Sequence, residues 1–382
     1  MIGERCNVVP LTQRHVTAAV AFLRACYGDD YYGADETYFR WLYLESPCAW
    51  FESERERDRI PVNGVFDAKG GLEAIHAYLP FDAVTPWGGS IGVWDVEWIN
   101  ASGVGGTGQA LASRLLEQVD VYAGYGCNQR SASAFRKMGL TVVDEIPRLV
   151  AILDRDRLGD LCAQNGYPFE ASALPPVTVF CEGPWHLLDR AALVPGAILA
   201  AARRGVRFGV SRSPAWLGWR YDRHPFIAYR VVAPDPMGER GAAVVRVERI
   251  VGSDLHVCRV LDFFFAPGHE SALLAAVLTY AREQTCLVAD YFDTAATSAH
   301  LVETAARSLD ASLLWTPRVP FMFQPTAFND RNSINLVIAL GGRARGSTEL
   351  GAFHATKADS NQDVLRDSRT SPRPYPRSRP DF

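Results

Sequence analysis

Hydrophobic and polar positions follow two periods along the first 140 residues, and these periods alternate in a definite order. Runs of period two predict β-strands, and runs whose apolar residues recur three and four positions apart predict helices. The predicted elements, in chain order, are a strand at 8–11, helices at 12–26 and 36–46, strands at 62–67, 72–79 and 92–99, a helix from 107, a strand at 121–125 and a helix at 131–138. With closing strands expected at 141–154, the pattern predicts an α/β domain that ends near residue 155.

A glycine-rich turn joins the strand at 92–99 to the next helix. Residues 101–108 have the sequence A-S-G-V-G-G-T-G, and helical periodicity starts at Thr107. Glycines let the backbone approach a ligand closely, while the free amides and the dipole of a helix N-terminus attract an anion. The turn therefore predicts a site for a phosphate or a diphosphate group.

A second motif follows at the spacing that one known family uses. Asn128, Ser131, Ala134, Phe135 and the pair Gly139-Leu140 form N-x-x-S-x-x-A-F-x-x-x-G-L. This motif resembles the second helix of the GNAT superfamily of N-acetyltransferases, written N-x-x-A-x-x-L-Y-x-x-x-G-F. Residues 103–108 likewise resemble that family's acyl-coenzyme A loop, Q/R-x-x-G-x-G/A.

The resemblance implies a mixed, mostly antiparallel sheet flanked by helices, with acyl-coenzyme A as the co-substrate and no metal ion. It assigns cofactor contacts to Val104, Gly105, Gly106, Thr107, Gly108, Gln109, Asn128 and Phe135. Two positions depart from the family pattern. Gly103 replaces the usual Gln or Arg, and Phe135 replaces the tyrosine that many members use as a general acid.

The glycine spacing also permits a dinucleotide site. Gly103, Gly105 and Gly108 satisfy G-x-G-x-x-G, but that fingerprint needs an acidic residue about 20 positions further on. Residues 126–128 are Gly, Cys and Asn at that place. A nucleotide-dependent oxidoreductase therefore remains as an alternative enzyme.

The pattern of strands and helices starts again after residue 176, which predicts a second copy of the domain. A helix bearing Trp-x-Tyr ends at a proline in both halves, at 41–47 and at 219–225. We expect two tandem GNAT-like domains, at 1–155 and 177–341, with a linker at 156–176 and a polar, disordered tail at 342–382. The second copy has Ala-Pro-Gly-His-Glu at 266–270 in place of the glycine turn, so we expect it to frame the acceptor site.

Composition narrows the function and the compartment. The 382 residues carry a formal charge of −4, which disfavours extended nucleic-acid binding. The eight cysteines form no C-x-x-C pair, which argues against zinc. Because no leader-like segment and no apolar run of membrane-spanning length occurs, we expect a cytoplasmic protein without membrane contact.

N-acyl transfer needs a base that accepts a proton from the attacking amine. Asp95 and Glu97 lie two apart on the predicted strand before the turn, so we expect them to share a face and at least one of them to act as the base. His76, in mid-strand, fits a hydrogen-bonded core residue better than a catalyst. Four residues near strand ends in the second copy are candidates for acceptor binding: Asp262, His269, Asp290 and Asp293.

The resemblance implies direct attack of the amine on the thioester without an acyl-enzyme. The tandem chain resembles bacterial acyltransferases that act on amino sugars, including nucleotide-linked ones, although an amino acid or a peptide would also fit the sequence. A coenzyme A-binding regulatory module without catalysis is the non-enzymatic alternative. The aromatic residues Trp41, Tyr43, Trp219 and Tyr221 are expected in the core rather than at a ligand.

Overall fold

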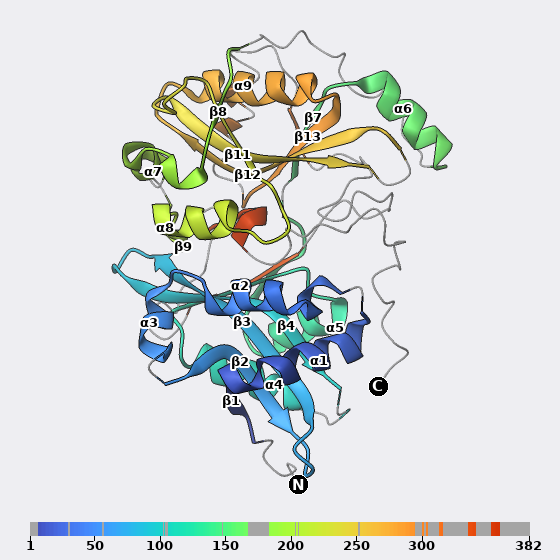
Figure 1. Ribbon diagram of the computed structural model, residues 1–382, viewed down its shortest axis with the longest axis vertical. Helices are drawn as coiled ribbons and strands as arrows, with labels where there is room; N and C mark the ends of the chain where they lie inside the picture. The colour runs from blue at the N-terminus through green and yellow to red at the C-terminus, as the bar shows by residue number, and fades with distance from the viewer. Residues whose placement is uncertain are drawn as a thin grey trace. The chain divides into compact units, whose positions relative to one another are not determined.

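The computed structural model places the chain in two compact units, each built around its own sheet (Figure 1). It describes residues 7–29, 31–55, 57–101, 103, 106–146, 148–166, 183–202, 204, 206–250, 253–294, 300, 301, 303, 304, 313–315, 335–340 and 353–359. Of the predicted cofactor residues, Val104 and Gly105 lie outside these ranges.

The sheet of the first unit has the strand order β1-β2-β3-β4-β5-β15-β6. Its strands are β1 (Val9–Thr12), β2 (Arg59–Phe66), β3 (Leu72–Val84), β4 (Ser90–Asn100), β5 (Val121–Tyr125), β15 (Leu336–Leu340) and β6 (Thr141–Val143). All neighbours are antiparallel except β4 and β5, which are parallel. The parallel pair is where the chain crosses over through a helix, as parallel strands require.

The helices of the first unit are α1 (Val16–Tyr27), α2 (Glu36–Leu44), α3 (Ala49–Arg55), α4 (Thr107–Leu116) and α5 (Gln129–Lys137). Apolar residues of α4 and α5, among them Leu115 and Phe135, pack on Tyr78, Val93 and Tyr122 of the sheet. Trp41 and Tyr43 of α2 are 2% and 3% exposed, which confirms their assignment to the core.

The sheet of the second unit repeats these strand directions in the order β8-β10-β11-β12-β13-β7-β14. Its strands are β8 (His186–Leu188), β10 (Arg230–Ala233), β11 (Gly241–Arg249), β12 (His256–Phe265), β13 (Cys286–Phe292), β7 (Arg148–Ile152) and β14 (Leu313–Trp315). The parallel pair is β12 and β13, and α9 (Glu270–Glu283) is the crossover between them. The expected tandem architecture of two mixed sheets is therefore present.

The domain boundaries differ from those expected. Strand β7, assigned from the sequence to the first domain, pairs with β13 and β14 of the second sheet. Its place in the first sheet is taken by β15, which pairs with both β5 and β6. The residues of β7 are all buried, so the strand lacks the alternation that would assign it to one sheet.

The expected linker and tail also contain ordered structure. Helix α6 (Arg155–Gln164) packs Leu158 and Leu161 on the second sheet. In the tail, β16 (Phe353–His354) pairs in parallel with β9 (Phe208–Val210). The disorder expected from residue 342 onward is therefore wrong for 353–359, because this segment buries Phe353, Thr356 and Asp359.

A buried ion cluster holds the segment 353–359 within the second unit. The Arg212 guanidinium donates to Asp262, with Nε–Oδ2 at 3.1 Å, and to Asp359, with Nη2–Oδ2 at 2.9 Å. The guanidinium also lies 4.4 Å from the ring centroid of Trp216. Asp359 accepts the backbone amide of Thr356 as well, so one arginine neutralises two carboxylates from distant parts of the chain.

This cluster makes the effects of two substitutions unequal. Arg212→Met leaves two buried carboxylates without their guanidinium, which costs about 3–5 kcal/mol for a broken buried pair. Asp359→Asn keeps the pair of Arg212 with Asp262 and retains an oxygen acceptor, so we expect about 1 kcal/mol. Urea unfolding followed by tryptophan fluorescence measures both losses. Equal losses in the two variants would contradict the assignment of Arg212 as the shared counter-ion.

Candidate active site

The turn before α4 ends in a left-handed glycine that opens the helix. Gly106 is the N-cap residue, with φ +89°, and an added Cβ would meet no atom within 4 Å. The first hydrogen bond of the helix runs from the Ala110 amide to the Gly106 carbonyl at 2.9 Å. The amides of residues 107–109 therefore precede the regular helical bonds and are directed out of the N-terminus, as an anion site requires.

Gly108 is required for packing rather than for a turn. A Cβ at this position would lie 2.9 Å from Nε1 of Trp98, and that indole nitrogen donates to the Gly108 carbonyl at 3.0 Å. The Trp98 ring in turn lies 4.7 Å from the ring of Phe135, between centroids. Trp98 on β4 thus fixes the first turn of α4 against α5.

The two motif residues of α5 have structural contacts of their own. Asn128 caps the helix, its Oδ1 accepting the Ser131 amide at 2.8 Å. Phe135 is fully buried against Trp98 and Tyr122. A phenyl ring offers no acidic proton, so this position cannot supply the general acid found in many GNAT enzymes. The cofactor contacts predicted for Asn128 and Phe135 stay predictions.

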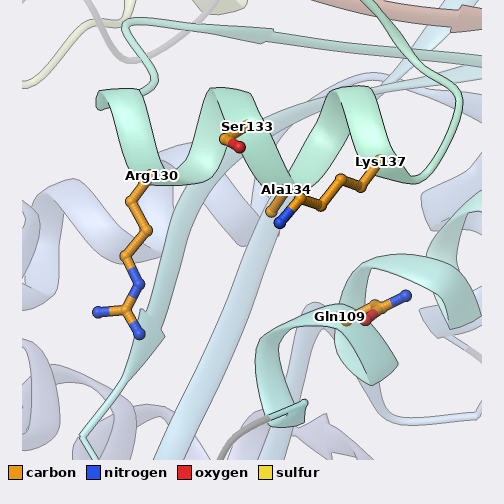
Figure 2. A pocket seen from close by; sticks show the side chains of 5 residues that line it. All are labelled: Gln109, Arg130, Ser133, Ala134 and Lys137. Carbon is orange, nitrogen blue, oxygen red and sulfur yellow. The ribbon is translucent and has the colours of Figure 1, made fainter.

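A pocket of about 380 Å³ lies between the start of α4 and one face of α5 (Figure 2). Gln109 lines it from α4, and Arg130, Ser133, Ala134 and Lys137 line it from α5. The four residues of α5 have the spacing i, i+3, i+4, i+7 and therefore form one stripe of the helix. Two cations beside a helix N-terminus make the pocket suitable for a phosphorylated ligand.

Arg130 and Lys137 are functional candidates that the sequence motifs did not single out. Their side chains extend from the side of α5 that faces Gln109 (Figure 2). The signal was present as a polar stripe opposite the buried Ala132 and Phe135. A polar stripe on a surface helix is ordinarily solvated, so only the position of α4 gives these two cations a shared pocket.

A β-bulge separates the two candidate bases. Ala77 of β3 pairs with Glu97, whereas the next residue, Tyr78, pairs with Asp95, so Val96 is an extra residue in β4. Because neighbouring residues of β3 point to opposite faces, Asp95 and Glu97 do so too. The expectation that they share a face is therefore wrong, and the bulge is the reason.

Asp95 belongs to a buried network on the face that α4 and α5 cover. Its carboxylate accepts the Tyr122 hydroxyl at 2.7 Å and lies 3.2 Å from Nε2 of His76. The Asp95 side chain is 8% exposed, and that of His76 is fully buried. The core assignment of His76 agrees with these contacts, and both oxygens of Asp95 already have partners.

Glu97 lies on the opposite face, beneath the end of α1 and the segment that follows. Its carboxylate accepts the hydroxyl of Tyr31. Burial raises the pKa of Glu97 to about 8, although a hydrogen bond from the Tyr27 side chain lowers it in part. With this pKa the group becomes a carboxylate near pH 8, and that carboxylate is a stronger base than an ordinary glutamate, so Glu97 is the better candidate of the two.

The parallel pairing of β4 and β5 ends beside these residues. The last pair of the ladder is Asp95 with Gly124, and an added Cβ at Gly124 would lie 3.1 Å from the Asp95 Cβ. Within the part of the chain that the structure describes, strand β4 continues to Asn100 along β3 after its pairing with β5 has ended. The end of the ladder, the bulge and the N-terminus of α4 therefore follow one another within residues 95–107.

The second unit has the same backbone device with different side chains. Val244 pairs with Asp262 and Val245 with Val260, so Leu261 is the bulged residue and Asp262 corresponds to Glu97. Asp262 is engaged by Arg212 and by the Tyr221 hydroxyl. His269, the N-cap of α9, makes no side-chain capping bond, and Pro267 removes an amide from the preceding turn.

The other acceptor candidates of the second unit also have internal partners. Asp290 accepts Nη2 of Arg148 at 2.8 Å and bonds Arg259, and Asp293 accepts the Tyr291 hydroxyl at 3.2 Å. Asp290 and Asp293 are 2% and 1% exposed. Acceptor binding by Asp262, His269, Asp290 and Asp293 stays a prediction.

Metal-ligand clusters and membrane-spanning helices are both absent from the described residues. These residues contain no group of three or more His, Cys, Asp and Glu side chains placed to hold a metal ion. Within the same ranges, every helix is too short or too polar to span a bilayer.

Comparison with known proteins identifies relatives by structure alone. No protein-family model matches the sequence, and no curated protein matches it either. A GCN5-related N-acetyltransferase from Anabaena variabilis has a TM-score of 0.57 at 10% identity, covering 87% of this chain and 72% of its own. A GCN5-related N-acetyltransferase from Kribbella flavida has a TM-score of 0.54 at 12% identity, covering 87% of this chain and 70% of its own.

A probable N-acyltransferase from Enterococcus faecalis gives a TM-score of 0.53 at 10% identity, covering 87% of this chain and 72% of its own. At such identities the likeness establishes the fold. The chain thus has the fold of the GCN5-related N-acetyltransferases, and this confirms the resemblance seen in its two motifs.

Proposed function

We propose that the protein is an acyl-coenzyme A-dependent N-acyltransferase whose reaction takes place in the first unit. The observation that carries the proposal is the pocket formed by Gln109 of α4 and the stripe of α5 that bears Arg130 and Lys137. The diphosphate of coenzyme A would lie at the amides of residues 107–109, with the two cations paired to its phosphates. The end of the β4–β5 ladder leaves a strand edge along which the acyl arm would run.

Glu97 is the base in this proposal. Its carboxylate takes a proton from the acceptor ammonium ion, and the neutral amine attacks the thioester carbonyl. The carbon–nitrogen bond forms, the carbon–sulfur bond breaks, and the nitrogen loses its second proton to water as the amide forms. Phe135 supplies no proton, so the thiolate leaves as an anion and takes its proton from solvent.

Direct attack fits the state of Cys127, a thiol three residues before Arg130 of the pocket. Burial raises the pKa of Cys127, which follows β5, to about 12. Because the thiolate is the nucleophilic form of cysteine, this side chain would be protonated and inert at neutral pH. The acceptor is a small amine, and amino sugars remain within the proposal together with amino acids and peptides.

Ligand choice tests the proposal against the oxidoreductase alternative. Acetyl-coenzyme A at 100 times its dissociation constant should stabilise the protein by about 2.7 kcal/mol, and NAD should give no comparable shift. Thiol release over a panel of amines then tests catalysis. Coenzyme A binding without thiol release from any amine would favour the regulatory module.

Arg130 and Arg136 provide a matched pair, since both are exposed arginines of α5 and only Arg130 lines the pocket. Arg130→Gln should weaken coenzyme A binding about tenfold, the effect of losing one charge-assisted contact. Arg136→Gln should change the dissociation constant less than about twofold. Isothermal titration measures both constants. An equal loss in the two variants would mean that general charge attraction, rather than the pocket, binds the cofactor.

Glu97→Gln tests the base by activity and by stability. The variant should lose most of its acyl transfer at pH 8, on the order of 100-fold. The raised pKa of about 8, against 4.5 for an ordinary glutamate, means that the folded state holds a proton that the unfolded state releases. Stability of the wild type therefore falls as pH rises from 4.5 to 8, by about 1.4 kcal/mol per pH unit.

Glutamine does not ionise, so the stability of the variant should not fall in this way between pH 4.5 and 8. The variant should therefore become more stable relative to the wild type over this range, and the difference in unfolding free energy should stay constant above pH 8. Urea unfolding at pH 5, 6.5 and 8 measures the difference. A wild type and variant that lose stability in parallel would show that Glu97 titrates normally, and the base would have to be sought elsewhere.

A further inference from the structure

Tyrosines crowd the approach to Glu97 from the end of α1 and the segment after it. The rings of Tyr27 and Tyr31 have centroids 4.5 Å apart, and those of Tyr31 and Tyr32 are 4.8 Å apart. All three residues are half-buried, whereas Glu97 beneath them is 5% exposed. A row of rings that reaches solvent thus covers a buried carboxylate.

The position of Tyr31 is fixed by the backbone below it. A Cβ at Gly33 would lie 2.5 Å from Cε1 of Tyr31, so glycine at this position makes room for the ring. The next residues begin α2, where Asp35 caps the helix by accepting the Tyr38 amide at 2.9 Å. The ring of Tyr31 is therefore held over Glu97, and its hydroxyl donates to that carboxylate.

The chemistry of this arrangement suits an ammonium ion. Aromatic faces attract cations, and a carboxylate accepts hydrogen bonds from N–H groups with an energy that neutral donors do not match. A neutral alcohol of the same size would gain neither the attraction of the rings nor that of the charge. The burial of Glu97 under half-buried rings favours a small ammonium ion over a bulky one.

We infer that Tyr27, Tyr31 and Tyr32 form the acceptor subsite and that this subsite binds a small aliphatic ammonium ion. In the free protein the Tyr31 hydroxyl donates to Glu97. An N–H of the bound ion takes over that position. The inference rests on the proposed function and adds the class of acceptor. Glu97 touches the reacting amine, whereas Tyr31 is a positioning residue. On arrival of the ion, one N–H replaces the O–H of Tyr31, and that proton then passes to the carboxylate.

Because of this exchange, two substitutions of Tyr31 should change the affinity for an ammonium ion in opposite directions. Tyr31→Phe keeps the ring and removes the competing hydroxyl, so n-butylammonium should bind about three- to tenfold more tightly than to the wild type. Tyr31→Leu also removes the aromatic face, so the same ion should bind about tenfold more weakly than to Tyr31→Phe. A tyrosine with a purely structural role would loosen the site on either change and weaken binding in both.

The experiment titrates the wild type and both variants with n-butylammonium, and with n-butanol as the neutral probe of the same length, in the absence of acyl-coenzyme A. The pH is about 9, above the pKa of Glu97 and below that of an aliphatic amine. Nuclear magnetic resonance of the protein reports the dissociation constants, and urea midpoints verify that each variant is folded. We expect the two signs given above for the cation and changes below about twofold for the alcohol. Binding of the cation to Tyr31→Phe that is unchanged or weaker would overturn the inference, as would equal responses to the two probes.

Titration of the same three proteins with coenzyme A separates this inference from the proposed function. The dissociation constant of coenzyme A should be the same in all three, because Tyr31 lies on the face of β4 opposite to Asp95, α4 and α5. Failure of the wild type to bind coenzyme A would remove the proposed function while the cation titration stays readable. Normal coenzyme A binding without discrimination between the two probes would remove only the ammonium subsite.

Discussion

A single extra residue in β4 is the constraint on which the candidate site depends. Val96 interrupts the alternation of the strand and sends Asp95 and Glu97 to opposite faces of the sheet. One face is sealed by α4 and α5, so Asp95 satisfies its oxygens with Tyr122 and His76. On the other face Glu97 accepts the Tyr31 hydroxyl, and desolvation by burial raises the pKa of its carboxyl group. Two carboxylates of the same strand thereby acquire different chemistry.

The second unit shows what the same bulge does in a different environment. Leu261 is the extra residue in β12, and Asp262 follows it as Glu97 follows Val96. Here Arg212 lies against the carboxylate, and Asp359 shares the guanidinium. The oxygens of Asp262 are thus bonded to Arg212 and to the Tyr221 hydroxyl within the unit. The backbone repeat is therefore retained while the side chains divide the two units into a site that fits catalysis and an ion cluster that holds the C-terminal segment.

Trp98 joins the proposed anion site to the strand of the proposed base. This residue follows Glu97 on β4, donates to the Gly108 carbonyl and packs on Phe135. Glycine at 108 is what allows the indole to approach the helix. A shift of the first turn of α4 would thus be felt at the strand that carries Glu97, and the reverse holds as well. Preorganisation of this kind would serve the proposed reaction, in which an acyl group and an amine meet within a narrow range of positions.

The sequence by itself determined the succession of elements, the glycine turn, the two motifs of the first unit and the existence of a second copy, because these are encoded in local periodicity and in residue types with special backbone freedom. It could not assign β7 and β15 to their sheets, since an apolar strand carries no mark of its partners and strand pairing joins residues far apart in the chain.

The sequence pattern also missed the bulge at Val96, because one extra residue leaves the alternation of apolar and polar residues nearly intact. Only the tertiary structure decided which carboxylate is buried among tyrosines, which cations of α5 meet α4, and that Asp359 is the second partner of Arg212, because each of these depends on the environment that other segments bring to a side chain.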